Sequence, residues 1–422
     1  MDRRTLLKTA LGAALTAYRP FARAGNARVL IIGGGWGGLA AARALRQLAP
    51  SLDVTLLARD SHFTSFPLSN RWLCGLLPQP PIRAAYADIA RRQGYRFLQT
   101  EVTAVDRENR QISASSGPLP YDWLVIAAGI RENHGAWFGD DIELARLTRE
   151  KFASGHVDPA GLPALRQKLA GFNGGTLVLT IPPAPYRCPP APYERALMIA
   201  ETLRQRQLKA RLVILDPNLP MLAFDRVYRD AYRDWITYLP QATIRHVDPL
   251  ARRIQTEFDT VDFTDALLAP PQQAADLLWK SDLIGHNSDG SPSGWAAHDP
   301  THLHAIGDPN VFLIGDQLDR SSTLFGFYPK TGQIAARQGQ IVAREIAARA
   351  AGETPPRLLP DSSCQVITRV SPREMTRIDT SYRFRGDGLI QQTVRQQHIP
   401  QAADEDIAWA QAMYAELGIP SD

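Results

Sequence analysis

The chain has 422 residues, of which 44% are hydrophobic and 21% are charged, and this composition is typical of a globular protein with an apolar core. A chain of this length can form two or three domains. The formal net charge is +4, but the first 24 residues carry five basic residues against one acidic residue, so the remainder is close to neutral. A near-neutral protein is a poor partner for nucleic acid or for an anionic membrane surface.

The first 24 residues have the features of an export signal. The pair Arg3-Arg4 precedes an apolar run over 9–17, and Ala22-Arg23-Ala24 fits a cleavage site between small residues. We therefore predict a twin-arginine signal peptide over 1–24 and a mature protein in the periplasm. The alternative, an uncleaved membrane anchor, is disfavoured because the apolar run is far shorter than a bilayer span. We expect no transmembrane segment in the mature chain.

A glycine-rich loop follows the export signal. Residues 29–32 (VLII) read as a buried parallel strand, and an Ala-rich helix comes directly after the loop. Between them Gly33, Gly35 and Gly38 form G-x-G-x-x-G. Gly33 permits a tight turn, Gly35 lets the backbone approach a pyrophosphate, and Gly38 lets the helix pack close to the strand. The loop predicts a dinucleotide site at a helix N-terminus; the alternative is an ordinary glycine-rich turn.

The strand that begins at Asp53 lacks the usual acidic residue at its end. Such a residue normally accepts hydrogen bonds from the ribose hydroxyls of the dinucleotide. Ala58 stands at the expected position, followed by Arg59 and Asp60. Either Asp60 or a backbone group takes this contact, or the contact is absent. Arg59, together with Val102 in the next predicted strand pair, is assigned to the cofactor site.

Two later segments indicate a flavin. The strand over 121–130 ends in Ala127-Ala128-Gly129, and a buried strand over 311–316 ends in Asp316. The carboxylate of Asp316 can accept hydrogen bonds from the ribityl hydroxyls of a flavin. A first glycine loop, a strand closing in A-x-G and a late strand delivering Asp form the pattern of flavin-binding proteins with two dinucleotide folds. We therefore predict FAD, contacted by Ala128, Gly129 and Asp316.

The middle of the chain repeats the strand–helix–strand order, over 176–183, 193–206 and 211–216. A nicotinamide dinucleotide would need glycines in the loop between the first strand and the helix. The loop over 182–195 instead has six prolines and no glycine. Proline offers no N–H group and keeps the backbone rigid. We therefore predict that this fold does not bind NAD(P)H.

These elements predict an α/β protein with two Rossmann-like dinucleotide-binding domains and a smaller α+β C-terminal domain. The FAD-binding domain is expected over 25–150 and 301–355, because the late strand returns to the first sheet. The second dinucleotide fold is expected over 151–300, and the C-terminal domain over 356–422.

Cysteine and histidine usage does not suggest a metal site. The three cysteines are too few for a disulfide scaffold and lack metal-ligand spacing, and three histidines surround a Pro-Thr turn without an evident ligand pattern. The cysteines are Cys74, Cys188 and Cys364, and the histidines are His298, His302 and His304.

The proline-rich loop IPPAPYRCPPAPYERA (181–196) resembles that of the flavoprotein subunit of flavocytochrome c sulfide dehydrogenase, in the wider sulfide:quinone oxidoreductase group. The likeness runs through nearly the whole mature chain, including a C-terminal domain of the flavocytochrome c type. It implies a periplasmic flavoprotein that takes electrons from sulfide at a cysteine disulfide beside the flavin. It also implies a bound c-type cytochrome as electron acceptor, or the membrane quinone pool in the quinone-reducing branch. The similar segments are VTLL (54–57), LSN (68–70), ILD (214–216), GD (315–316), PKTG (329–332) and the closing helix (404–417).

The resemblance assigns roles to individual residues. Cys188 matches the first redox cysteine of the family, and Glu194 matches an acidic residue that handles protons. Lys330 and Gly332 match the loop that opens a helix near the pyrimidine edge of the flavin. A lysine ammonium or a helix N-terminus at that edge would stabilise the reduced, anionic flavin.

Two positions depart from the family pattern. The second redox cysteine of the family follows Gly-Asp in the late strand loop, but no cysteine stands between Asp316 and Lys330 here. Phe66 stands where the subunit often tethers its flavin through a cysteine, so we expect non-covalent FAD. Without the second cysteine, the disulfide step cannot run in its usual form.

Three mechanisms stay open. In the first, Cys188 alone carries a persulfide or attacks the flavin, with Glu194 handling protons. In the second, Cys74 has moved into range and pairs with Cys188. In the third, sulfide chemistry is lost and the flavin serves another substrate or none, as in a silent binding partner. Cys188 can also be an inert buried thiol, and Glu194 a first-turn carboxylate favoured by the helix dipole. Cys364 matches a family cysteine outside the redox pair and is expected to be structural.

Overall fold

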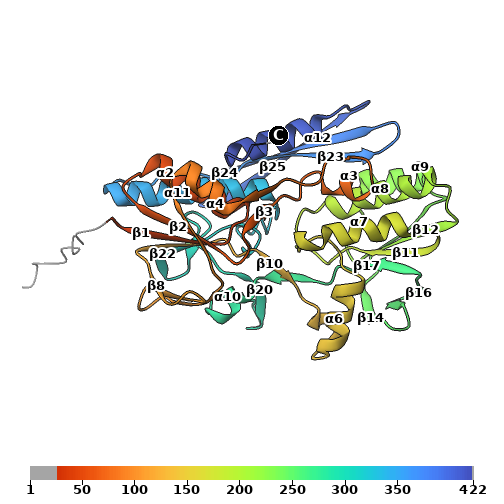
Figure 1. The fold of residues 1–422 in the computed structure, drawn as a ribbon, viewed down its shortest axis with the longest axis horizontal. Helices are drawn as coiled ribbons and strands as arrows, with labels where there is room; N and C mark the ends of the chain where they lie inside the picture. The colour runs from red at the N-terminus through yellow and green to blue at the C-terminus, as the bar shows by residue number, and fades with distance from the viewer. Residues whose placement is uncertain (1–25, 421–422) are drawn as a thin grey trace, which may run out of the picture.

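Two α/β bodies lie side by side, and the C-terminal segment runs across both (Figure 1). The computed structural model describes residues 26–420; the predicted signal peptide lies outside the described residues. In Figure 1 the first body carries β1, β2 and β22, the second carries β11 and β12, and the blue C-terminal strands and α12 lie along the top. This architecture confirms the predicted α/β class with two Rossmann-like folds.

The first body is built on a six-stranded sheet in the order β21-β22-β9-β1-β2-β5. β1 pairs in parallel with both β2 and β9, and β22 pairs in parallel with β9, so a strand from late in the chain completes the N-terminal sheet. The aliphatic runs of these strands are buried, as the sequence predicts for a parallel sheet covered on both faces. The strands are β1 (Arg28–Ile32), β2 (Asp53–Ala58), β5 (Arg96–Gln99), β9 (Trp123–Ile126), β21 (His304–Ala305) and β22 (Asp308–Leu313).

Two helices pack closely against each other on this sheet, α2 (Trp36–Leu48) and α11 (Gly332–Ala351). A Cβ atom at Gly339 would lie 2.3 Å from the carbonyl oxygen of Gly37, so both helices need glycine at the crossing. The first body also contains α4 (Tyr86–Gln93), α10 (Asp276–Lys280), β3 (His62–Thr64), β4 (Arg83–Ala85), β6 (Val102–Asp106), β7 (Gln111–Ala114), β8 (Leu119–Pro120), β19 (Ile284–His286) and β20 (Pro292–Ala296). The short helix α3 (Ser69–Leu73) packs instead against two helices of the second body.

The second body has a four-stranded parallel sheet in the order β13-β12-β11-β17. Its helix α8 follows the proline-rich loop and is buried along most of its length. β10 (Ile130–Glu132) and β18 (Gln272–Ala274) pair between the two bodies. The remaining elements are α5 (Gly135–Phe138), α6 (Ile142–Lys151), η1 (Pro159–Gly161), α7 (Leu162–Gly171), β11 (Gly175–Thr180), α8 (Ala191–Gln205), β12 (Ala210–Asp216), α9 (Leu222–Ala231), β13 (Ile236–Pro240), β14 (Ile244–Asp248), β15 (Arg253–Thr256), β16 (Thr260–Asp262) and β17 (Asp265–Leu267).

The C-terminal segment forms an antiparallel sheet, β23 (Ser362–Arg369), β24 (Glu374–Phe384) and β25 (Ile390–Ile399), followed by α12 (Glu405–Glu416). Helix α12 returns to the start of the chain: the ring of Tyr414 stacks on Trp36 with centroids 5.9 Å apart. A buried ion pair joins Asp406 to Arg71 of α3 at 3.0 Å. The C-terminal segment is therefore packed onto the N-terminal glycine loop and its neighbours.

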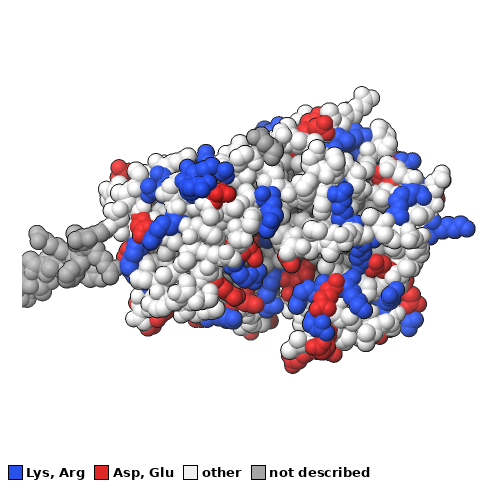
Figure 2. All heavy atoms as spheres, viewed as in Figure 1, with Lys and Arg blue, Asp and Glu red and all other residues white. Residues whose placement is uncertain are grey.

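Charged side chains of both signs are interspersed on the visible face, most clearly around α6 at the bottom of the view (Figure 2). On that helix Arg146 pairs with both Glu143 and Glu150. Within residues 26–420, no helix combines the length and apolar character needed to cross a bilayer. In the same part of the chain, no group of three or more His, Cys, Asp or Glu side chains is arranged to hold a metal ion.

Candidate functional site

A cavity of about 1270 Å³ lies where the two bodies and the C-terminal sheet meet. It opens at the carboxyl ends of β1, β9 and β22, where ligands of open α/β sheets normally bind. The cavity is larger than the roughly 300–1,000 Å³ of ordinary small-molecule pockets, as an elongated dinucleotide requires. The walls come from the glycine loop, the end of β9, the start of α11, the proline-rich loop and β23.

The three glycines of the first loop serve three different purposes. Gly33 has a φ of +104°, and a Cβ atom there would lie 2.2 Å from the carbonyl oxygen of Ala127. Gly38 does not line the cavity, but a Cβ atom at this position would lie 1.9 Å from the carbonyl oxygen of Gly33. At Gly35 a Cβ atom would meet no heavy atom within 4 Å, because this residue faces the open cavity at the N-terminus of α2. Of the three glycines, only Gly35 therefore has free space at its Cβ position, where a ligand can approach the backbone.

Asp316 presents a buried carboxylate to the cavity. Its Oδ2 accepts from Nε of Arg187 at 2.7 Å, whereas its Oδ1 is buried without a hydrogen-bond partner among the described residues. A buried oxygen of this kind normally has a donor. Ala128 and Gly129 line the cavity beside it. The orphaned oxygen and the open face of Gly35 both fit an FAD: the first matches a ribityl hydroxyl, the second a pyrophosphate at a helix N-terminus.

Arg59, Asp60 and Val102 all line the cavity, with Arg59 and Asp60 exposed at its mouth. The nearest approach of Arg59 Nε to Asp60 Oδ1 is 3.9 Å, so neither side chain is held firmly by the other. Both remain candidates for the ribose contact that the sequence leaves open.

The ammonium of Lys330 does not face the cavity, which corrects the role expected for it from the sequence. Its Nζ donates to the carbonyl oxygens of Asp316 (2.7 Å) and Leu318 (2.9 Å) and lies 3.6 Å from the ring centroid of Trp295. Burial lowers the pKa of Lys330 to about 7. The long side chain thus turns into the loop after β22, whereas its neighbours Pro329, Thr331 and Gly332 line the cavity.

Cys188 lies in a tight turn before α8, with a φ of +48°. Its N–H donates to the carbonyl oxygen of Lys330 at 2.8 Å, and its own carbonyl accepts from the N–H of Ala191 at 2.9 Å. The half-buried thiol lines the cavity. Burial, followed by the negative charge of Glu194, raises the pKa of Cys188 to about 12. The thiol therefore stays protonated at neutral pH unless a base removes the proton.

The carboxyl group of Glu194 lies in the first turn of α8 and on the wall of the same cavity. Its Oε2 accepts from Nδ2 of Asn70 at 2.7 Å, and its Oε1 accepts from the N–H of Ile367 at 2.9 Å. Burial raises the pKa of Glu194 to about 7, although both of these hydrogen bonds lower it. A carboxyl group with a pKa near neutrality can both take up and release a proton.

Arg195 fixes the position of the Glu194 carboxyl group through Asn70. The sequence alone does not identify this arginine as a site residue. The buried guanidinium donates to Oδ1 of Asn70 at 2.9 Å and to the carbonyl oxygen of Gly155 at 3.1 Å, and it also bonds the carbonyl of Ser154. Burial lowers the pKa of Arg195 to about 10, so it remains charged at neutral pH. Because Asn70 is fixed by Arg195, its amide nitrogen is aimed at Glu194.

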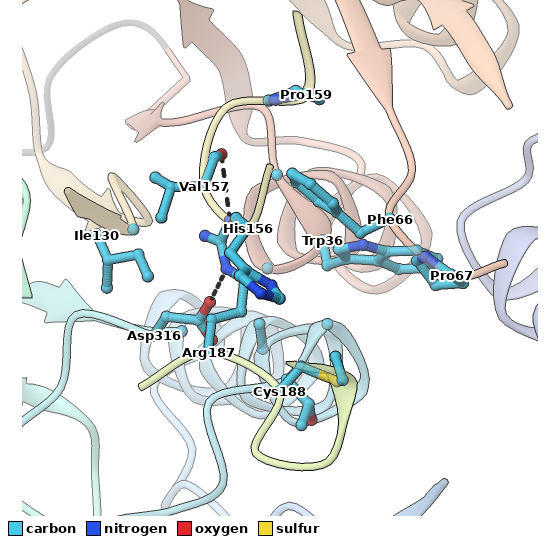
Figure 3. A pocket seen from close by; sticks show the side chains of 18 of the residues that line it. Trp36, Phe66, Pro67, Ile130, His156, Val157, Pro159, Arg187, Cys188 and Asp316 are labelled. Atoms are coloured by element: carbon cyan, nitrogen blue, oxygen red, sulfur yellow. Dashed lines mark hydrogen bonds and ion pairs between the residues drawn. The ribbon is translucent and has the colours of Figure 1, made fainter. Parts of the chain in front are cut away.

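A second arginine crosses the cavity (Figure 3). The guanidinium of Arg187 lies 5.5 Å from the ring centroid of Phe66, and its Nη1 is 3.4 Å from the carbonyl oxygens of His156 and Val157. Burial and the charges of Arg195 and Arg187 hold the pKa of His156 well below its usual value, so its ring is neutral. The wall next to Cys188 thus combines the guanidinium groups of Arg187 and Arg195 with the carboxyl groups of Asp316 and Glu194.

The three cysteines are free, but they occupy different environments. Cys74 is buried in the apolar cluster around α8 with Trp72 and Leu73. Cys364, in β23, is half-buried and lines the same cavity as Cys188. From the sequence, Cys364 is expected to be structural and to lie outside the redox pair; the structure places it on the cavity wall.

Two family models match this chain. Residues 27–150 match the pyridine nucleotide-disulphide oxidoreductases, and residues 163–268 match the family described as sulfide dehydrogenase (flavocytochrome c) flavoprotein chain, central. Among curated proteins, the sulfide-quinone reductase of Aquifex aeolicus is 28% identical over 185 residues, 44% of this chain and 41% of that protein. The type II NADH:quinone oxidoreductase NdhA of Mycobacterium tuberculosis is 34% identical over 132 residues, 30% of this chain and 27% of that protein. The aligned stretches span less than half the length of either relative.

Solved structures share the fold over nearly the whole chain. The sulfide:quinone oxidoreductase of Aquifex aeolicus gives a TM-score of 0.70 at 19% identity, covering 94% of this chain and 93% of that one. The NDH2 of Plasmodium falciparum, solved in complex with NADH, gives a TM-score of 0.68 at 14% identity, covering 93% and 95%. The two family matches and the shared fold together support the flavoprotein group that contains the sulfide:quinone oxidoreductases and the pyridine nucleotide-disulphide oxidoreductases.

Proposed function

We propose that this chain is a periplasmic, FAD-dependent oxidoreductase that oxidises sulfide or a related sulfur compound and passes the electrons to a c-type cytochrome. One observation carries the proposal: a thiol, Cys188, and a carboxyl group with a pKa of about 7, Glu194, share a cavity whose far wall fits FAD. The match of residues 163–268 to the sulfide dehydrogenase flavoprotein supports the same substrate class.

In this proposal FAD is held without a covalent bond. The glycine loop and the N-terminus of α2 bind the pyrophosphate, and Asp316 binds the ribityl chain through its orphaned Oδ1. Phe66 lines the cavity where a tethering cysteine stands in the resembling subunit. When bound, FAD supplies an acceptor for two electrons.

The protein groups around Cys188 bind the anion and move protons. Arg187, which is paired with Asp316, lines the cavity next to Cys188 and offers guanidinium N–H groups to a hydrosulfide anion. Ionised Glu194 accepts a proton from the Cys188 thiol or from bound sulfide, because its pKa of about 7 keeps about half of the molecules ionised at neutral pH. The Cys188 thiolate is the nucleophile in the two mechanisms left open by the sequence that retain sulfide chemistry.

The periplasmic location and the cytochrome partner rest on the sequence. The paired arginines and small-residue cleavage site over 1–24 support twin-arginine export. The resemblance to a flavocytochrome c subunit supports a c-type cytochrome, and the glycine-free loop over 182–195 argues against NAD(P)H as donor. Co-purification of a haem protein from periplasmic extract tests both points.

The decisive experiment is anaerobic titration of the FAD-loaded protein with sulfide, followed by flavin absorbance. Wild type is expected to bleach, and Cys188→Ser is expected to stay oxidised. Cys74→Ser is the matched control, because Cys74 is a buried cysteine within the apolar cluster. Absence of bleaching in wild type contradicts sulfide oxidation.

A second candidate follows from the loop after β22. No cysteine stands between Asp316 and Lys330, where the resembling family has its second redox cysteine. A flavoprotein of the same fold with another substrate, or a silent flavin-binding partner in a periplasmic complex, would have no need of that residue. FAD retention without bleaching by sulfide is the expected result for this candidate.

A further inference from the structure

We propose that Cys364 is the second thiol of the site and pairs with Cys188 as a redox-active dithiol. The inference rests on the proposed function for its substrate, but the pairing itself is a property of the protein. Of the three free cysteines, Cys188 and Cys364 line the same cavity. They are separated by 176 positions in the sequence and belong to different parts of the fold.

The segments that carry the two cysteines are attached to the same four residues of the chain. The N–H of Cys188 donates to the carbonyl oxygen of Lys330 at 2.8 Å. The N–H of Ser363, next to Cys364, donates to Oε1 of Gln333 at 2.5 Å. Residues 330–333 form the short turn into α11, so both cysteine backbones are anchored at one point.

Glu194 makes a second link between the two segments. It lies on α8 just after the Cys188 turn, and its Oε1 accepts from the N–H of Ile367, three residues after Cys364 in β23. Helix α8 and strand β23 pack against each other. The carboxyl group is thus held between the two cysteine-bearing segments.

The electrostatics agree with this geometry. Burial raises the pKa of Cys364 well above its usual value, followed by the charges of Cys188 and Glu194. Cys74 differs: after burial, the charge that affects its pKa most is Arg195, which lowers it. Cys364 therefore lies close enough to Cys188 and Glu194 for their charges to raise its pKa, and Glu194 also raises the pKa of Cys188. Because Glu194 raises the pKa of Cys74 as well, the shared cavity rather than the electrostatics distinguishes the pair Cys188 and Cys364.

The chemistry balances in two steps. In the first, the S–H bonds of Cys188 and Cys364 break and one S–S bond forms; two protons leave, one of them through Glu194, and two electrons pass to the bound flavin. In the second, hydrosulfide attacks Sγ of Cys188, the S–S bond breaks, a persulfide forms on Cys188, and Cys364 leaves as the thiolate. The second step needs no oxidant.

Peptide mapping tests the pairing directly, because trypsin places each cysteine in a separate peptide. The peptides are 72–83 with Cys74, 188–195 with Cys188 and 358–369 with Cys364. The FAD-loaded protein is treated anaerobically with the thiol oxidant diamide, its remaining thiols are alkylated after denaturation, and the digest is analysed by mass spectrometry. We expect two of the three thiols to be lost, with 188–195 linked to 358–369.

Two variants complete the test. Cys74→Ser is expected to give the same linked pair, and Cys364→Ser is expected to keep Cys188 as a free thiol. A link between 188–195 and 72–83, or three free thiols in the treated wild type, overturns the proposal. The linked peptides are measured in the wild type and in Cys74→Ser, so the test stays valid even if Cys364→Ser does not fold.

The dithiol pairing and the proposed sulfide oxidation can be confirmed or refuted independently of each other. The linked pair without bleaching by sulfide supports the dithiol and contradicts sulfide oxidation. Bleaching that persists in Cys364→Ser supports sulfide oxidation and contradicts the dithiol.

Discussion

Replacing Glu194 by glutamine removes the proposed proton acceptor while keeping its size and its hydrogen-bonding oxygen. Burial raises the pKa of Glu194 from its ordinary value of 4.5 to about 7. At about 1.36 kcal/mol per pKa unit, this change corresponds to about 3 kcal/mol between the ionised and neutral forms. The raised pKa of Glu194 determines the pH dependence of both activity and stability, so the variant Glu194→Gln tests both.

For activity, the ionised fraction of a group with a pKa of about 7 rises from about 10% at pH 6 to about 90% at pH 8. Sulfide itself titrates near neutrality, so the useful quantity is the ratio of wild-type to variant rates at each pH. We expect this ratio to rise about tenfold from pH 6 to pH 8 in stopped-flow measurements of flavin reduction. At pH 8 the variant is expected to be about 10²–10⁴-fold slower than wild type. A ratio that stays constant over this range refutes Glu194 as the proton acceptor.

For stability, the sign follows from the raised pKa. Below pH 4.5 both the folded and the unfolded chain bind the proton; between pH 4.5 and about 7 only the folded chain keeps it, so the free energy of unfolding falls as pH rises. The loss is at most about 3 kcal/mol. Glu194→Gln lacks this slope, so its stability relative to wild type is expected to increase from pH 5 to pH 7.5 in urea unfolding. Glu150→Gln, on the exposed helix α6, is the control, and an equal slope in wild type and Glu194→Gln contradicts the burial argument.

Three further predictions concern the cofactor and the fold. Gly35→Ala is expected to fold but to retain little FAD, because its Cβ meets no protein atom and blocks only the space for the ligand. Gly38→Ala places a Cβ 1.9 Å from the carbonyl oxygen of Gly33 and is therefore expected to lower the melting temperature as well. Equal melting temperatures of the two variants would count against this close approach of Gly38 to Gly33. Acid precipitation is expected to release all flavin into the supernatant, since Phe66 offers no tether, and flavin left in the pellet would argue for a covalent bond. Asp406→Asn leaves the buried Arg71 guanidinium with only the exposed Asp404 carboxylate, 3.5 Å away, and is expected to cost up to about 3–5 kcal/mol in urea unfolding, against less than about 1 kcal/mol for Asp88→Asn in an exposed ion pair. Similar losses in the two variants would contradict the burial of the first pair.

Much of the fold is predicted by local patterns. The aliphatic runs, the glycine loop and the proline-rich loop each constrain their own backbone, and the structure forms strands and helices at these segments. The order of Gly33, Gly35 and Gly38 predicts one tight turn, one open face and one close crossing, and the distances from their Cβ positions agree. These features are predictable because each depends on residues close together in the sequence.

The orientation of long side chains is not predictable in this way. Lys330 stands where the sequence suggests a flavin contact, yet its Nζ turns to the carbonyls of Asp316 and Leu318 and to the face of Trp295. A lysine side chain reaches several ångströms in any direction, and the partners that fix it come from other loops. The same is true of Arg195, whose partners lie more than a hundred positions away in Asn70 and about forty away in Gly155.

The sequence by itself determined the strand–helix order, the dinucleotide loop, and the presence of a thiol and a carboxyl group six positions apart in the proline-rich turn and the helix that follows it. The tertiary structure decided which residues share the cavity with them. Cys364 shares the cavity with Cys188 only because β23 of the C-terminal sheet packs on α8, and Arg187 meets Asp316 only because β22 completes the N-terminal sheet. Contacts of this kind depend on how separate bodies pack, and no local pattern of residues records that packing.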